Sequence, residues 1–185
     1  MEPVSRKIGK YTLLHEIGRG GMSVVWEAFD NELRRRVAMK FLTSYRSTAT
    51  AVEYEDDETV KRFYREAQTA AKLKHPNIIA IYEVGVREGM HYIAMEFVEG
   101  MTLNESIAGK MLDRKTGIRL LRDVARAIEH AHSVGIIHRD IKPQNVMIDV
   151  SGRVRLADFG LAKDLTVDSI SVIGELAGSY YYMSP

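Results

Sequence analysis

The sequence contains no cysteine among its 185 residues, and this absence excludes disulfides and thiolate metal sites. It also lacks any run of about 20 apolar residues, the length that a membrane-spanning helix needs. The first residues, MEPVSRKIGKY, have no apolar core of the kind found in signal peptides. These absences favour a reducing, cytoplasmic setting, although a membrane span after residue 185 stays open.

The sequence also has no excess of positive or negative charge. The chain has 26 basic and 25 acidic residues and a net charge of +1, so its composition implies no nucleic-acid partner. Hydrophobic residues make up 45% and charged residues 28% of the chain, as in soluble globular proteins. No internal repeat or low-complexity tract is present, and we expect one ordinary domain or one small domain plus part of another.

Two short apolar runs near the C-terminal end of the sequence, at 146–148 and 154–157, predict a β-hairpin. The residues between them, Asp149–Gly152, have the composition of a turn, with Ser151 and Gly152 at its tip. Polar residues stand at both open ends of this hairpin, and a hairpin holds its two open ends side by side.

Asn145 precedes the hairpin and Asp158 follows it, and their side chains offer hard oxygen ligands that suit Mg²⁺. Asp140 and Lys142 lie a few residues upstream. A metal site with a carboxylate and a cation beside it fits metal-assisted phosphoryl transfer. The alternative is a polar hairpin whose carboxylates are simply hydrogen-bonded.

A glycine-rich turn near the N-terminus separates two predicted strands, Tyr11–Ile17 and Val24–Phe29. The turn reads Gly18-Arg19-Gly20-Gly21-Met22-Ser23, and its backbone N–H groups could approach a phosphate. The alternative is an ordinary tight hairpin. A dinucleotide-binding fingerprint is disfavoured, because that motif opens a helix and a strand follows here. Further strands are predicted at 37–42, 78–86 and 91–97.

Two helices are predicted from apolar residues at helical spacing, which in the first helix are Val60, Phe63, Ala67 and Ala70. The first begins at Asp57, ends near His75-Pro76, and carries Glu66 beside its apolar face, although Glu66 could also be a surface residue paired with Arg62 or Arg65. The second spans about 114–133. Its predicted buried stripe consists of Ile118, Leu121, Val124, Ala125, Ile128 and Ala131. His130 and His132 lie on different faces of it, so we interpret both as structural or surface residues.

The segments His138-Arg139-Asp140-Ile141-Lys142-Pro143-Gln144-Asn145 and Asp158-Phe159-Gly160 together resemble the catalytic loop and the metal-binding triplet of eukaryotic-type (Hanks-type) protein kinases. The pattern Gly18-x-Gly20-x-x-Ser23-x-Val25 is similar to the kinase glycine-rich loop, with Ser23 in place of the third glycine. The sequence GGMS at 20–23 is typical of bacterial members of the family. Lys142 favours the serine/threonine branch. Residues 178–185 resemble the end of an activation segment, with Ser179 for the usual threonine and Tyr180 for the usual proline.

This resemblance implies an α+β, two-lobe protein-kinase fold. Residues 1–10 would be an N-terminal extension, and 11–97 an N-lobe with a five-stranded antiparallel sheet and one helix. Residues 98–185 would hold the hinge and an incomplete helical C-lobe. The helices that cover the underside of 114–133 in the family would then be absent, so we expect the chain to be a fragment of a larger serine/threonine kinase.

The resemblance also implies ATP bound between the lobes, with Mg²⁺ or alternatively Mn²⁺. Lys40, held by Glu66, would bind the α- and β-phosphates, and Asp158 and Asn145 would hold the metal. Asp140 would accept the proton of the substrate hydroxyl, and Lys142 would stabilise the γ-phosphoryl group. The implied nucleotide-binding residues are Gly18, Gly20, Gly21, Ser23, Val25, Ala38, Lys40, Met95, Glu96, Val98 and Met147. Thr102 would reach the ribose.

The implied partner is a protein substrate with serine or threonine hydroxyls, and autophosphorylation is expected among Thr166, Ser169 and Ser171. Two alternatives stay open. A pseudokinase or nucleotide-binding signalling module would keep the shape without the chemistry, which radiolabel transfer to a generic substrate would test. A small-molecule phosphotransferase would lack the ordered closing segment, and a phosphoacceptor screen would test that.

Overall fold

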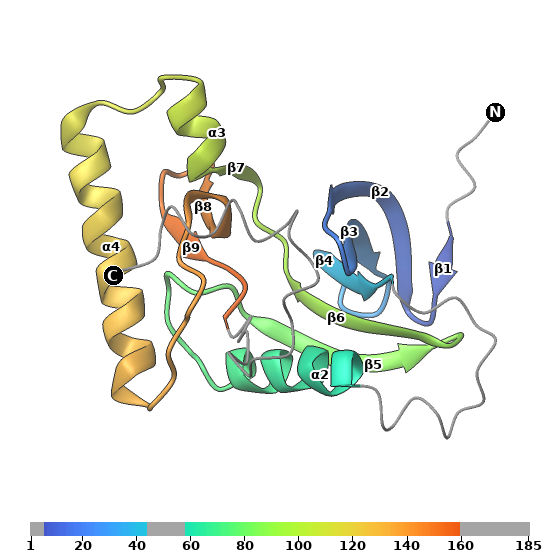
Figure 1. The fold of residues 1–185 in the computed structure, drawn as a ribbon. Helices are drawn as coiled ribbons and strands as arrows, with labels where there is room; N and C mark the ends of the chain where they lie inside the picture. Colours follow the sequence, from blue (N-terminus) through green and yellow to red (C-terminus); the bar gives the residue numbers. More distant parts are fainter. Residues whose placement is uncertain (1–5, 44–57, 160–185) are drawn as a thin grey trace. The chain divides into compact units, whose positions relative to one another are not determined.

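The computed structural model describes residues 6–43 and 58–159 (Figure 1). These residues fall into two units. Unit 1 comprises Met1–Ala71 and Ala80–Phe97, and unit 2 comprises Lys72–Ile79 and Val98–Pro185. The segment 72–79 therefore groups with the second half of the chain, although it follows the first helix directly.

Unit 1 is built on one antiparallel sheet of six strands in the order β1-β2-β3-β4-β6-β5. The strands span Lys7–Ile8 (β1), Tyr11–Arg19 (β2), Ser23–Asp30 (β3), Arg35–Leu42 (β4), Ile81–Arg87 (β5) and Met90–Glu96 (β6). Consecutive strands pair in sequence order up to β4, and β6 then lies between β4 and β5. The five strands predicted from the sequence are all present.

The sheet has one strand more than the sequence predicted. Lys7 and Ile8 belong to the expected N-terminal extension, but they pair with Thr12 and Tyr11 as the edge strand β1. The physical reason is Ile8, which is only 1% exposed because its side chain joins the apolar face of the sheet. One buried side chain in a polar segment is too weak a pattern to predict a two-residue strand.

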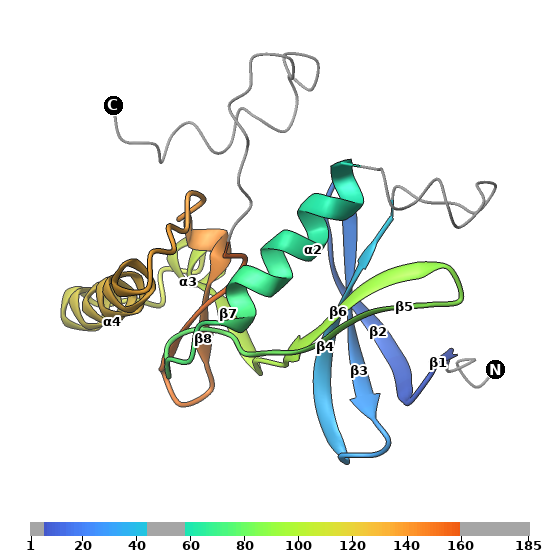
Figure 2. The same cartoon turned by 90° about the horizontal axis from the view of Figure 1, so that it is seen from below.

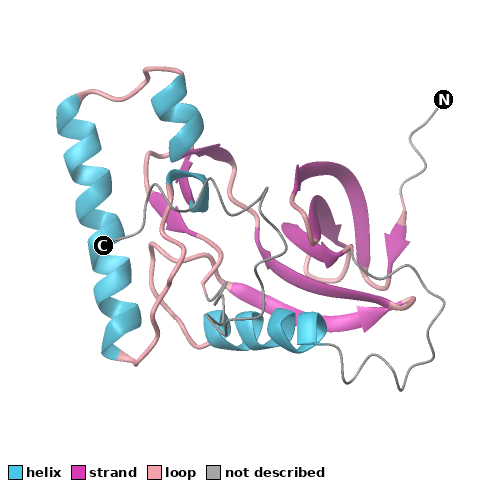
Figure 3. Ribbon diagram, in the orientation of Figure 1, coloured by secondary structure: helices cyan, strands magenta, loops and turns pink. Residues whose placement is uncertain are grey.

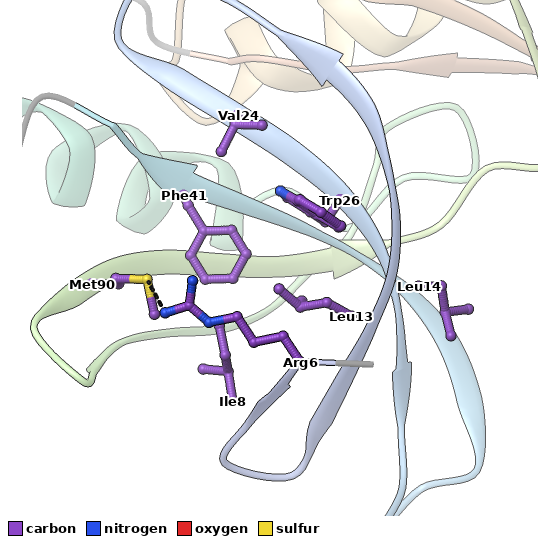
Figure 4. Close-up of a pocket in the computed structure, with 8 residues that line it drawn as sticks. All are labelled: Arg6, Ile8, Leu13, Leu14, Val24, Trp26, Phe41 and Met90. Carbon is purple, nitrogen blue, oxygen red and sulfur yellow. Dashed lines mark hydrogen bonds between the residues drawn. The ribbon is translucent and has the colours of Figure 1, made fainter. Parts of the chain in front are cut away.

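One face of this sheet forms the core of unit 1, because side chains alternate between faces along each strand. The buried cluster consists of Ile8, Tyr11, Leu13, Val24, Ala28, Val37, Met39, Phe41, Tyr92 and Ala94, with Trp26 and Met90 packed against it. A small apolar hollow of about 230 Å³ opens beside this cluster, and Figure 4 shows its lining side chains. They are Arg6, Ile8, Leu13, Leu14, Val24, Trp26, Phe41 and Met90.

Helix α2 (Glu58–Ala71) packs on the sheet beside β5 (Figure 2). Its buried residues are Val60, Phe63, Ala67 and Ala70, the same four that the helical spacing predicts. They pack with Leu42 and Ile93. The helix ends at Ala71, four residues before the predicted end at His75. The predicted start at Asp57 lies outside the described residues.

Glu83 on β5 anchors a polar cluster at the edge of the unit 1 core. Its carboxylate accepts hydrogen bonds from the hydroxyls of Tyr11 (2.9 Å) and Tyr92, and it pairs with Lys10 Nζ at 2.7 Å. Burial alone would raise the pKa of Glu83, but these three donors outweigh it and lower the pKa. Burial and the hydrogen bond to Glu83 raise the pKa of Tyr92 to about 12.

Replacing Glu83 by alanine is expected to lower the free energy of unfolding by about 1–3 kcal/mol, because two buried tyrosine hydroxyls lose their acceptor. Glu88→Ala is the matched control. Glu88 pairs with Arg6 at 3.7 Å, and both side chains are about 60% exposed, so this pair is worth at most about 1 kcal/mol. Urea unfolding of both variants measures the difference, and equal losses would contradict the role of Glu83.

The described residues of unit 2 form a three-stranded sheet and two α-helices (Figure 3). The sheet has the order β7-β8-β9, with β7 at Gly100–Thr102, β8 at Val146–Asp149 and β9 at Val154–Leu156. Strands β8 and β9 form the predicted hairpin. Gly152 lies in its turn with φ of +77°, and Ser151 N–H donates to Asp149 Oδ1 at 2.9 Å. The helices are α3 (Leu103–Ala108) and α4 (Arg114–Ser133), and a short 3₁₀ turn, η1, spans Pro143–Asn145.

Helix α4 has the predicted bounds but buries a different face from the predicted one. Leu120, Val124, Ala127 and Ala131 are buried. Ile118 is 60% exposed and Leu121 63% exposed, although both belong to the predicted stripe. The helix carries two overlapping apolar stripes, and contact with β9 selects the one that contains Leu120. Within the described residues, no helix is long and apolar enough to cross a membrane.

Candidate functional site

Four of the predicted nucleotide-binding residues share one face of the unit 1 sheet. Val25 and Lys40 are paired across β3 and β4, and Ala38 and Met95 are paired across β4 and β6. Residues 38 and 40 are two apart on β4, so their side chains project to the same face. This is the face opposite the apolar cluster that contains Val37, Met39 and Phe41. The sheet therefore separates a core face from a face that carries the predicted site.

The glycine-rich turn joins β2 to β3 next to this face. Gly18 is paired with Val25, and Gly20 N–H donates to the carbonyl of Ser23 at 2.8 Å. A Cβ atom added at Gly18 or Gly20 would meet no heavy atom closer than 3.9 Å, and neither glycine has a positive φ. The fold itself thus does not require glycine at these two positions. Close approach of a ligand to the backbone would require it.

Lys40 lies on the face of the sheet that α2 covers. Leu42 and Ile93, which share this face with Lys40, pack against buried residues of α2. Glu66 is half-buried on α2, between Phe63 and Ala67 of its apolar face. The register therefore puts the predicted lysine and the predicted glutamate on elements that pack against each other.

Glu96, a predicted hinge residue, has one backbone group that is already bonded within unit 1. Its backbone N–H donates to the carbonyl of Ala80 at 2.8 Å, so this group is not free for an adenine edge. Val98, which begins the second part of unit 2, is buried. In unit 2, Met147 is half-buried on β8 and paired with Thr102.

Unit 2 holds Asp140 in a set of charge-assisted contacts. The carboxylate oxygen Oδ2 of Asp140 lies 2.9 Å from Lys142 Nζ and 3.0 Å from Asn145 Nδ2. Asn145 Nδ2 also donates to the backbone carbonyl of Asp140 at 2.8 Å. The Asp140 side chain is 14% exposed, so it is oriented by its neighbours while still reachable from solvent. This combination suits a group that accepts a proton from a bound hydroxyl.

The β8–β9 hairpin brings Asn145 beside the residues that lead into Asp158, as the sequence predicts. The N–H of Ala157 donates to the carbonyl of Asn145 at 2.8 Å. Because the Asn145 amide nitrogen is used by Asp140, its amide oxygen is the atom that could face a cation. The described residues contain no group of three or more His, Cys, Asp or Glu side chains arranged to hold a metal. A site with an amide and a carboxylate fits Mg²⁺, which takes few protein ligands and completes its shell with phosphates and water.

Two residues that flank this site have left-handed backbone conformations without being glycine. Arg139 has φ of +65° and Asp158 has φ of +55°. Such conformations cost roughly 1–2 kcal/mol each. Strain of this kind clusters at functional sites, where the surrounding structure holds a side chain in a required direction.

His138 is a buried support for Asp140. It is 1% exposed, and its ring lies 4.5 Å from the ring of Phe159. Its Nδ1 accepts from the N–H of Asp140 at 3.3 Å, so the proton is on Nε2, which donates to the Ala157 carbonyl at 2.9 Å. Burial lowers the pKa of His138, although the Ala157 carbonyl and the charges of Asp158 and Asp140 oppose this. The neutral ring therefore links Asp140 to the end of the hairpin at Ala157.

The stability of the fold is expected to fall as the pH drops through about 6.5. Burial lowers the pKa of His138, and also those of His75 and His91, so these rings are protonated more readily in the unfolded chain than in the folded one. Stability then rises with pH across the window between the lowered pKa values and 6.5, and is fully present above it. Urea unfolding from pH 8 to pH 5.5 measures the slope. An unchanged slope in His138→Gln would contradict the contribution of His138.

Sequence reasoning missed one role in unit 2. Thr102 does not stand as a free hydroxyl for a ribose, because it caps α3. Its Oγ1 accepts from the N–H of Glu105 at 3.1 Å and donates to Glu105 Oε2 at 2.8 Å. The signal was present in the sequence as Thr-x-x-Glu, the capping-box pattern.

Several predicted features lie outside the described residues. They are the predicted helix start at Asp57, the glycine of the triplet at 160, and the activation segment. This segment includes the candidate phosphorylation sites Thr166, Ser169 and Ser171 and the closing residues Ser179 and Tyr180. His130 stays a structural residue, as predicted, since its ring stacks on His75 with 5.2 Å between centroids.

Comparison with known proteins identifies relatives over almost the whole chain. The family described as "Protein kinase domain" matches residues 11–185. The chain is 43% identical over 179 residues to serine/threonine-protein kinase PrkC of Bacillus subtilis, covering 96% of this chain and 26% of PrkC. It is 38% identical over 184 residues to serine/threonine-protein kinase PknA of Mycobacterium tuberculosis, covering 96% of this chain and 41% of PknA.

A solved structure titled "PpkA-294 apo form" has a TM-score of 0.76 and 27% sequence identity, over 86% of this chain and 62% of that structure. The chain thus spans about a quarter to two fifths of the length of these curated relatives. The likeness to bacterial serine/threonine kinases and the fold class agree with the sequence prediction.

Proposed function

Because this chain belongs to the protein kinase family, we propose that it transfers the γ-phosphoryl group of ATP to serine and threonine hydroxyls of proteins, as part of a longer protein. The single observation that supports this best is Asp140, whose carboxylate is held by Lys142 and Asn145 and remains reachable from solvent. A site of this kind performs phosphoryl transfer mainly by positioning and electrostatics.

Each described side chain then has one task. In unit 1, the glycine-rich turn covers the phosphates with backbone N–H groups, and Lys40 pairs with the α- and β-phosphates. In unit 2, Asp140 orients the substrate hydroxyl and accepts its proton. Lys142 offsets negative charge on the transferred group. His138 keeps the loop in register through the N–H of Asp140.

Asn145 and Asp158 would hold the divalent ion, for which we propose Mg²⁺. The ion, when bound, supplies positive charge that offsets the charge developing on the phosphate oxygens. The chain's own contribution is to hold the amide oxygen of Asn145 in place, and the two hydrogen bonds from its nitrogen to Asp140 do this. Asp158 has a left-handed backbone with φ of +55°, a strained conformation of the kind found at functional sites.

The serine/threonine class is favoured over the alternatives by particular residues. Lys142, two positions after Asp140, pairs with it at 2.9 Å, and a lysine at this position resembles the serine/threonine branch of the family. A pseudokinase would have no need of the intact set of Lys40, Glu66, Asp140, Asn145 and Asp158. The relatives PrkC and PknA are both named serine/threonine-protein kinases.

The test is transfer of labelled phosphate from ATP by the longer protein that contains this chain, with Mg²⁺ present. We expect label on a generic protein substrate, with phosphoserine and phosphothreonine after hydrolysis and no phosphotyrosine. Nucleotide binding without transfer would identify a pseudokinase. Label only on small-molecule acceptors would identify a small-molecule phosphotransferase.

A further inference from the structure

Met22 in the glycine-rich turn contacts helix α2, and neither sequence pattern nor family likeness drew attention to it. The guanidinium nitrogen Nη2 of Arg62 donates to Sδ of Met22 at 3.3 Å. Met22 is also fixed through its backbone, because its carbonyl accepts from the N–H of Thr43 at 2.9 Å, just after β4 ends. The turn is thus tied to β4 by its main chain and to α2 by one side chain.

The neighbours of Met22 make this contact specific to its side chain. Gly20 and Gly21 have no side chain, and the long side chain of Arg19 pairs with Glu16 instead, so Met22 is the turn residue whose side chain contacts α2. In the part of the chain that the structure describes, Met22 is the side-chain partner of Arg62. Arg62 stands four residues before Glu66, one helical turn away on the same side of α2.

We propose that Met22 and Arg62 form a latch that couples the glycine-rich turn to helix α2, which makes Met22 a positioning residue for the nucleotide phosphates. This inference rests on the proposed function, because the turn matters only if it covers ATP. Coupling is reciprocal: a nucleotide that holds the turn down also favours the position of α2 that presents Glu66, and the reverse holds as well.

The chemistry of the contact provides a precise test. A thioether is a weak acceptor, whereas leucine has nearly the same volume and no acceptor, and glutamine has nearly the same length and a strong amide acceptor. Met22→Leu should therefore break the latch, and Met22→Gln should keep or strengthen it. Arg62→Leu removes the donor. Arg65→Leu is the matched control, because Arg65 is an exposed arginine on the same helix.

The experiment measures KM for ATP, kcat and the Kd of a fluorescent ATP analogue in the longer protein. Met22→Leu should raise KM and Kd by about two- to threefold, the low end for one hydrogen bond because a thioether is a weak acceptor, with kcat within about twofold. Met22→Gln should match or improve on the wild type. In the Arg62→Leu background, the leucine and glutamine variants at position 22 should have equal KM and Kd. Arg65→Leu alone should leave KM, kcat and Kd unchanged.

Two results would overturn the latch. One is equal Kd for the leucine and glutamine variants with Arg62 intact, and the other is a difference between them that persists in the Arg62→Leu background. Nucleotide binding without phosphate transfer would contradict the proposed function while still testing the latch through Kd. Absence of nucleotide binding by the wild type would overturn both.

Discussion

A kinase that carries Asp140→Asn is expected to lose about 10²–10⁴-fold in kcat, while its affinity for ATP changes little. Asparagine has the shape of aspartate, so the loop can keep its contacts with Asn145 and Lys142. It lacks the negative charge and basicity that accept a proton from the substrate hydroxyl. Steady-state phosphorylation of a protein substrate, with ATP affinity measured separately, gives both numbers.

Asp123→Asn is the control for removing a carboxylate from unit 2. Asp123 lies on α4, with its side chain 19% exposed, and pairs with Arg122 at 3.0 Å. A pair of this kind near the surface contributes at most about 1 kcal/mol, so the variant should keep full activity. If Asp140→Asn retained more than about a tenth of the wild-type kcat, a loss below roughly 1.4 kcal/mol in the barrier, Asp140 would not be the catalytic base.

The sequence predicted those parts of the fold in which a local pattern of apolar or turn residues is compatible with only one structure. In α2, every apolar residue at helical spacing faces the sheet, so Val60, Phe63, Ala67 and Ala70 were assigned correctly. The hairpin was predicted because turn residues separate two β-branched runs. The pairing of Asn145 with the end of that hairpin followed from it, and the hydrogen bond from Ala157 confirms the neighbourhood.

Where tertiary contacts compete with a local pattern, the sequence predicted less. Pro76 marks only the last residue at which α2 could end, and the helix ends earlier, at Ala71. The segment that follows is held by β9 instead: Asn77 Nδ2 donates to the carbonyl of Val154 at 2.9 Å, and Ile78 forms a bridge with Leu156. These bonds join residues nearly 80 positions apart, so no local pattern could reveal them.

For the candidate site, too, the sequence predicted the residues but not their contacts. The sequence motifs pointed to Lys40, Asp140, Asn145 and Asp158, but they did not predict which neighbours hold each side chain. The tautomer of His138 depends on one backbone N–H and one carbonyl that come from different segments. The capping role of Thr102 was missed, although its four-residue Thr-x-x-Glu pattern stands in the sequence, and its proposed reach to the ribose stays a prediction.

Leu120→Ala in the chain of residues 1–185 is expected to cost about 2–5 kcal/mol of unfolding free energy, while Leu121→Ala at the next position should cost less than about 0.5 kcal/mol. The two residues have the same side chain on the same helix. Leu120 is 1% exposed and Leu121 is 63% exposed, so only the first leaves a cavity when it is shortened. The stripe predicted from spacing alone gives the opposite order, since it includes Leu121 and omits Leu120. Urea unfolding of both variants decides between them.

Helix α4 exposes large apolar side chains on the side away from its buried face. Ile118 and Leu121 lie on this side, and Ile107 and Met111, from α3 and the segment after it, are also more than half exposed. We propose that a segment outside residues 1–185 covers Ile118 and Leu121 in the longer protein. Residues 1–185 alone should then self-associate, and Ile118→Lys with Leu121→Lys should restore a monomer on size-exclusion chromatography. In the longer protein, Leu121→Ala should cost about as much as Leu120→Ala, because both side chains are then buried. A stable monomer of residues 1–185 without these substitutions, together with a silent Leu121→Ala in the longer protein, would show that this face of α4 is a true surface.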